Sequence, residues 1–189
     1  MKTASACVKH GSPLSRFLCA ALMLLPMSVG AESLTPAMQE KVNKYTQKVI
    51  EWSQHPKVVD MLQKANLKGG VPGTSNLRWV ETNENDPAIA ALLNNDVSKL
   101  INGWATQDQG ISKLYLRDKE GNLVAADGKP VFYNNAHLPA FKNPRNGKPW
   151  AASAAKPDPT TQINGVHVGV PVMDRGQVIG VLHTSVVAD

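Results

Sequence analysis

The chain is poor in cysteine and lacks the common catalytic motifs. Its 189 residues contain two cysteines, Cys7 and Cys19, and both precede residue 20. Residues 32–189 therefore have no disulfide, no thiolate nucleophile, no cysteine zinc ligand and no covalent haem-attachment motif. The sequence also lacks a glycine-rich phosphate loop, an HExxH motif and a Gly-x-Ser-x-Gly motif. These absences argue against an enzyme, and we expect no resident cofactor.

The N-terminus has the pattern of a secretory leader. Three basic residues precede an apolar run over residues 17–27, and Val29 and Ala31 occupy the −3 and −1 positions of a cleavage site. The run is shorter than a typical membrane span. We therefore predict a signal peptide over residues 1–31, cleaved after Ala31, and a single periplasmic domain over residues 32–189. An uncleaved anchor is the alternative.

The charge of the chain lies partly in this leader. Residues 1–31 hold three of the 20 basic residues and none of the 15 acidic ones, which leaves 17 against 15, a net charge of +2. The remaining charges of both signs are interspersed along the chain. A basic surface for nucleic acid is therefore not expected.

The first half of residues 32–189 predicts helices. Apolar residues at spacings of three and four predict a long helix that starts at Thr35-Pro36 and carries Met38, Val42, Tyr45, Val49 and Trp52. A second helix is expected over residues 56–66, and residues 71–85 are expected to be irregular. Asp86-Pro87 opens a third helix, whose apolar stripe runs from Ile89 to Trp104.

From residue 111 the apolar period changes to two, which is typical of strands. A first hairpin is expected around the turn at residues 118–122, and residues 127–149 form a long connection. Further strands are expected over residues 150–155, 162–173 and 177–188. Helices followed by strands indicate an α+β fold, with an antiparallel sheet of about five strands packed against the long N-terminal helix and further short helices.

Three stretches of this half carry a resemblance to a known family. They are residues 114–125 (LYLRDKEGNLVA), residues 146–150 (NGKPW) with 158–161 (DPTT), and residues 168–181 (VGVPVMDRGQVIGV). Their order and spacing resemble the Cache (PDC) family of extracytoplasmic sensor domains, which have a PAS-like sheet. The resemblance implies a domain that binds a small molecule. Family members usually sit between two membrane helices of a receptor or kinase, so we expect here a stand-alone periplasmic form without an output domain.

In that family the ligand lies between the sheet and the long loop that follows the second strand. Applied to this chain, the resemblance predicts a site for an organic acid or an amino acid. Arg145 is expected to bind a carboxylate through two hydrogen bonds, and Asp158 is expected to receive an ammonium group or to cap its own turn. The candidate ligand-binding residues are Tyr133, His137, Arg145, Trp150, Asp158, His167 and His183.

Two of these candidates, His167 and His183, lie on the last two strands. They are about equally far from the turn at residues 174–176, which predicts that they are cross-strand neighbours. Gly165 and Gly169 share the face of His167 and are expected to leave open space for a ligand. Two facing imidazoles can bind a metal or haem, or act as a pH switch. Hydrogen-bonded sheet histidines are the simpler interpretation, and we predict no metal.

Two other functions compete with the binding of an organic acid or amino acid. One is a haem- or metal-binding sensor that uses His167 and His183. The other is a ligand-free interaction subunit of a membrane receptor or kinase that docks through its helical stripes or a sheet edge. The heptad-like spacing from Met38 to Trp52 also suggests a homodimer through the N-terminal helix.

Overall fold

The computed structural model describes residues 33–188. The predicted leader and its cleavage site lie outside these residues. Within residues 33–188, no helix combines the length and the apolar composition that crossing a bilayer requires.

Five helices precede the first strand. They are α1 (Pro36–Ser53), α2 (Pro56–Lys68), α3 (Asn76–Glu81), α4 (Pro87–Leu93) and α5 (Asp96–Thr106). The long N-terminal helix is confirmed, and Thr35 caps it by accepting a hydrogen bond from the backbone N–H of Met38. His55 and Asp86 cap α2 and α4 in the same way, each followed by a proline at the first helical position.

Two expectations about the helices are wrong. Residues 71–85 are not wholly irregular, because Ser75 caps the short helix α3. The predicted third helix is two helices, because the Asn95 side chain accepts a hydrogen bond from the N–H of Ser98 and starts α5 anew. The apolar stripe gives no sign of this break, because it continues through both α4 and α5 and each helix buries its own part of the stripe.

The strands form one antiparallel sheet. They are β1 (Ile111–Asp118), β2 (Leu123–Ala126), β3 (Trp150–Ala151), β4 (Lys156–Pro157), β5 (Asn164–Asp174) and β6 (Gln177–Val187). The order is β2-β1-β6-β5-β3, and β4 pairs separately with β5. This arrangement confirms the α+β fold. The strand expected over residues 150–155 ends at Ala151, and the two-residue β4 follows it.

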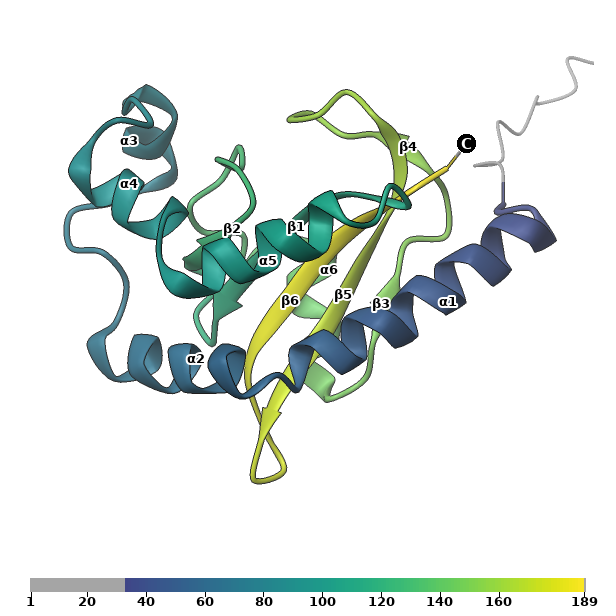
Figure 1. Ribbon diagram of the computed structural model, residues 1–189, viewed down its shortest axis with the longest axis horizontal. Coiled ribbons are helices and arrows are strands. Elements are labelled where there is room, and N and C mark those ends of the chain that lie inside the picture. Colours follow the sequence, from purple (N-terminus) through teal and green to yellow (C-terminus); the bar gives the residue numbers. More distant parts are fainter. Residues whose placement is uncertain (1–32, 189) are drawn as a thin grey trace, which may run out of the picture. The chain divides into compact units, whose positions relative to one another are not determined.

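The two faces of the sheet are covered differently. Helices α1, α2 and α5 pack on one face, and Figure 1 views the sheet from this helical face. The opposite face is covered by residues 127–163, which we call the cover. It contains the short helix α6 (Pro139–Lys142), the 3-10 turn η1 (Pro144–Asn146), β3 and β4.

The apolar stripe of α1 is buried inside the domain. Met38, Val42, Tyr45 and Val49 are buried and belong to the core that α1 forms with β5 and β6. The same stripe had suggested a homodimer, and its packing on the sheet leaves it unavailable as a dimer surface.

Candidate functional site

A cavity of about 260 Å³ lies on the face of the sheet opposite the helices, beneath the cover. Strand β1 contributes Lys113, Tyr115 and Arg117, and β5 and β6 contribute His167 and His183. The cover closes it with largely apolar groups, including Phe132, Leu138, Ala140 and Trp150. An apolar wall with a few convergent polar groups is typical of sites for small molecules.

Strand β1 alternates between the two faces of the sheet. Leu114 and Leu116 are fully buried in the core beneath the helices. Lys113, Tyr115 and Arg117 point to the other face and line the cavity. The Tyr115 ring lies between the two cations, 5.5 Å from Lys113 Nζ and 5.9 Å from Arg117 Cζ. This places positive charge along one side of the cavity.

Lys113 forms a buried ion pair with Asp158 of the cover. The Lys113 ammonium donates to Asp158 Oδ2, and the two side chains are 6% and 0% exposed. Asp158 Oδ1 accepts the backbone N–H groups of Thr160 and Thr161 at 2.9 and 3.0 Å. Burial alone would raise the pKa of Asp158, but these hydrogen bonds and the lysine charge hold it below its ordinary value. Asp158 therefore caps its turn and also receives an ammonium group, which belongs to the protein itself.

Arg117 ties the same strand to the cover. It is 2% exposed, and its guanidinium donates to the carbonyl oxygens of Phe132, at 3.0 Å, and Tyr133. Burial lowers the pKa of Arg117 to about 10, so the guanidinium remains a cation at neutral pH. Its Nε has no hydrogen-bond partner among the described residues.

Three buried polar atoms around the cavity are left without partners within residues 33–188. They are Arg117 Nε, Asn135 Oδ1 and His183 Nδ1, and each belongs to a residue that lines the cavity. Buried polar groups in native proteins nearly always find a partner. Three residues that line the cavity therefore have hydrogen-bonding capacity that the described protein leaves unused.

The two histidines contact each other diagonally. His167 lies opposite Ser185 and His183 lies opposite Gly169, so the expected direct cross-strand pairing is off by two residues. The rings still stack, and His167 Nδ1 lies 3.1 Å from His183 Nε2. Burial lowers the pKa of His167 to about 4 and that of His183 well below 6.5. Both rings are therefore neutral at pH 7.

The space expected at the two glycines is filled by the protein. A Cβ at Gly169 would come within 2.1 Å of the Ala140 carbonyl oxygen and 2.7 Å of Pro144. At Gly165 it would meet the Ser185 side chain. These glycines allow the cover and the neighbouring strand to approach β5 closely, and the cavity lies beside them.

The structure brings four of the seven predicted site residues together. Trp150, His167 and His183 line the cavity. Asp158 lies directly behind it, bonded to Lys113 and 3.8 Å from His167 Nε2.

The other three lie elsewhere. The Tyr133 ring packs against Trp79, and its hydroxyl accepts the backbone N–H of Val71 at 2.6 Å. Arg145 is exposed and donates to the Lys119 carbonyl oxygen. His137 is exposed and does not line the cavity.

Sequence reasoning missed Lys113, Tyr115, Arg117 and Asn135. The first three had a readable signal, because charged residues at positions 113 and 117 alternate with leucines in a strand. Such a pattern places the charges on the second face of the sheet, which in this fold is the face of the cavity. Asn135 lies in the long connection and had no comparable signal.

The described residues give no set of metal ligands that would support the metal or haem interpretation of the two histidines. Among the described residues, no group of three or more His, Cys, Asp or Glu side chains is arranged to hold a metal ion. The carboxylate near His167 is already bonded to Lys113.

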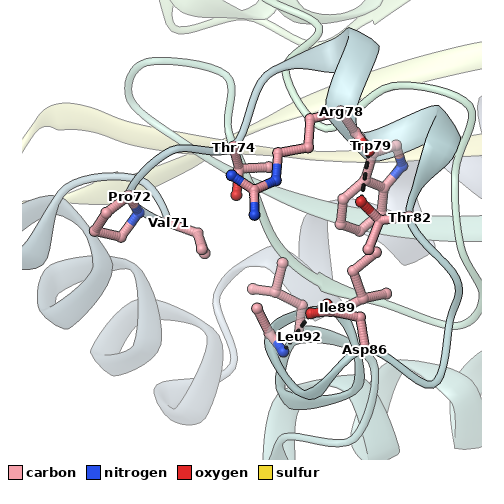
Figure 2. A pocket seen from close by; sticks show the side chains of 10 residues that line it. Val71, Pro72, Thr74, Arg78, Trp79, Thr82, Asp86, Ile89 and Leu92 are labelled. Atoms are coloured by element: carbon pink, nitrogen blue, oxygen red, sulfur yellow. Dashed lines mark hydrogen bonds between the residues drawn. The ribbon is translucent and has the colours of Figure 1, made fainter.

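Two other hollows differ from this cavity. One of about 80 Å³ lies between Arg78 and Trp79 of α3 and Ile89 and Leu92 of α4, as Figure 2 shows. A larger, open groove of about 480 Å³ runs beside α2 and α4. The unpartnered buried atoms identified within residues 33–188 belong to no residue that lines either hollow. The cavity beneath the cover is therefore the best candidate site.

No family model matches the sequence, and no curated protein matches it. Solved structures do resemble it. One is the sensor domain of the V. cholerae histidine kinase DctB, with 16% identity over 78% of this chain and 54% of that chain and a TM-score of 0.49. Another is the sensory domain of the Campylobacter jejuni chemoreceptor Tlp3 with isoleucine bound, with 12% identity over 80% and 55% of the two chains and a TM-score of 0.44.

A third is the ligand-binding domain of the Pseudomonas aeruginosa amino acid chemoreceptor PctC in complex with GABA. It is 15% identical over 78% of this chain and 62% of that chain, with a TM-score of 0.36. The chain thus spans about half the length of the DctB and Tlp3 domains. All three are sensor or ligand-binding domains of receptors or kinases, and none is more than 16% identical to this chain.

Proposed function

We propose that residues 32–189 are a periplasmic sensor domain that binds a small organic acid or amino acid in the cavity beneath the cover. One observation carries this proposal. The cavity is lined by the cations Lys113, Arg117 and Lys156, and none of the described residues that line it is acidic. A mainly apolar cavity with cationic side chains favours a small anion, and a carboxylate on a short carbon chain fits that description.

The polar groups suggest how such a ligand is held. Arg117 Nε is buried and free to donate to a carboxylate oxygen, and Asn135 and His183 offer further hydrogen-bonding atoms. Trp150 and Tyr115 provide aromatic surface for the carbon chain. A ligand bonded to both β1 and the cover would hold the cover against the sheet.

The test is a thermal-shift and calorimetric screen of the purified protein against short carboxylic acids and amino acids. A ligand at about one hundred times its dissociation constant adds about 2.7 kcal/mol, a shift of several degrees for a domain of this size. Trp150→Ala should weaken binding of the best ligand about tenfold. Trp104→Ala, which changes a tryptophan stacked on Trp52 in the helical layer, should leave affinity unchanged.

An interaction subunit without a ligand is the second candidate. It is favoured by Leu67, Leu77 and Val80 on α2 and α3, which are 90%, 72% and 62% exposed. Exposed apolar groups of this kind can mark a protein contact. A screen in which no acid or amino acid shifts the melting temperature would overturn the ligand proposal and favour this one.

A further inference from the structure

We infer that the cavity selects carboxylic acids that carry no ammonium group and excludes the corresponding α-amino acids. This inference rests on the proposed function, because it concerns the ligand class of the same site. It follows from what already surrounds Asp158.

Both oxygens of the Asp158 carboxylate already accept hydrogen bonds from the protein. Oδ2 accepts the Lys113 ammonium, and Oδ1 accepts the N–H groups of Thr160 and Thr161. Asp158 is also fully buried. A ligand ammonium could reach this carboxylate only by displacing Lys113, whose charge would then lie buried without a partner. Lys113 of β1 thus occupies the position in which the ammonium group of a ligand would bind to Asp158.

No other charged acceptor faces the cavity within the described chain. Asp127 acts on Lys113 and Tyr115 through its charge, but it does not line the cavity, and burial raises its pKa to about 6. The carbonyl oxygens of Phe132 and Tyr133 accept hydrogen bonds from Arg117. An α-ammonium group would therefore meet the cations of the lining and gain no compensating carboxylate.

Asn135 points to what the site accepts instead. Its Oδ1 is a buried acceptor without a partner among the described residues. A ligand hydroxyl can donate to this neutral oxygen and brings no further positive charge beside Lys113 and Arg117. A 2-hydroxy acid is nearly the same size as the matching amino acid, so the pair isolates the effect of the ammonium charge.

The first experiment is calorimetry on the purified protein with three matched pairs: L-lactate and L-alanine, L-malate and L-aspartate, and 2-hydroxy-4-methylpentanoate and L-leucine. The hydroxy acid should bind at least about tenfold more tightly than the amino acid of its pair. Equal or tighter binding of the amino acid would overturn this inference and leave the proposed function standing. If neither member of any pair binds, the inference is overturned, and the wider screen of acids and amino acids decides the proposed function separately.

The second experiment removes the internal ammonium. Lys113→Met exposes Asp158 to the ligand and should reduce the preference for the hydroxy acid at least about tenfold. Lys142→Met is the matched control, because Lys142 is an exposed lysine of the cover that does not line the cavity, and it should change the preference less than about threefold. An unchanged preference in folded Lys113→Met would contradict the inference.

Lys113→Met leaves a buried charge unpaired and could fail to fold. Asp158→Asn then serves in its place, because it keeps the side-chain shape and removes the negative charge. The variant should retain or increase the preference for the hydroxy acid, since Lys113 becomes free to bind a carboxylate. A switch to the amino acid would overturn the inference.

Discussion

Lys113 and Asp158 join the strand that forms one wall of the cavity to the cover that closes it. The pair is buried on both sides. Pairs of this kind gain little over apolar groups of the same volume, but losing one partner is costly because the other charge stays buried. Their value here is positional, because they fix the cover relative to β1.

We expect Lys113→Ala to lower the free energy of unfolding by about 3–5 kcal/mol, since it leaves the Asp158 carboxylate without its counter-ion. Lys156→Ala, at an exposed position of the same cavity, should change it by less than about 0.5 kcal/mol. Urea unfolding of the two variants and the parent protein measures both. Equal losses of unfolding free energy in the two variants would show that removing one partner of the buried pair costs no more than removing an exposed lysine.

The buried histidine pair makes stability depend on pH. Burial, followed by the charge of Lys113, lowers the pKa of His167 from 6.5 to about 4. Between these values the unfolded chain binds a proton that the folded chain does not, so stability falls as the pH falls. From pH 7 to pH 5 one such histidine costs about 2 kcal/mol. The raised pKa of Asp127 acts in the opposite direction.

His167→Gln separates these effects, because it removes one titrating ring and leaves Asp127 in place. The loss of stability between pH 7 and pH 5 should be smaller in the variant by about 2 kcal/mol. Urea unfolding at both pH values measures the difference. An identical loss in the variant and the parent would mean that His167 does not titrate in this range.

The two arginines illustrate what could be predicted for single residues. Arg145, in a polar loop, was an obvious candidate for binding a carboxylate, but its guanidinium lies on the surface and bonds to Lys119. Arg117, inside a strand, is the buried one. Composition and loop position cannot separate the two, whereas the alternation of charge and leucine along β1 could have done so.

At the scale of the elements, the strands were easier to predict than the breaks between helices. The alternating valines of β5 and β6 identify both strands to within two residues of their observed ends. The break between α4 and α5 depends on a single side chain. Asn95 accepts the Ser98 N–H and donates to the carbonyl oxygens of Leu92 and Val124.

Asn95→Ala should therefore destabilise the protein by about 1–2 kcal/mol, because it removes a helix cap and two further hydrogen bonds. Asn94→Ala is the matched control, since the Asn94 side chain is exposed and bonds to Ala90 of its own helix. Chemical denaturation compares the two. A loss of similar size in both variants would refute the role of Asn95 as the start of α5.

The contact between the cover and β5 depends on a glycine. We expect Gly169→Ala to lower stability by about 1–3 kcal/mol, because the new methyl group would collide with the Ala140 carbonyl and Pro144. Gly103→Ala, inside α5 with open space around it, should instead raise stability by about 0.5–1 kcal/mol. The melting temperatures of both variants show directly whether each substitution stabilises or destabilises the protein.

At the scale of the molecule, one sheet separates an apolar core from a cavity with cationic walls. The helical face packs valines and leucines against α1, α2 and α5, and the cover face carries the cations and histidines. The order of elements was enough to predict this α+β architecture. The path of the cover was not predictable, because it depends on side-chain bonds to backbone atoms, such as those of Arg117 and Asp158.

Hydrogen exchange should reflect this division. The tightest-binding acid of the screen should slow amide exchange more in the cover, residues 127–163, than in α1, because the acid bonds only to groups on the cavity side of the sheet. Exchange measured by mass spectrometry with and without the acid tests this. Equal slowing throughout residues 33–188 would indicate a general stabilisation of the fold.

The alternation along β1, β5 and β6 has a consequence for protein engineering. Positions 113, 115, 167 and 183 line the cavity, and positions 114, 168 and 182 belong to the core beneath the helices. A library restricted to positions 115, 167 and 183 can vary the lining of the cavity while the buried ion pair, the close-packed glycines and the scaffold's interior sequence stay constant. The domain is therefore a convenient starting point for biosensors, in which specificity and folding can be optimised in separate rounds.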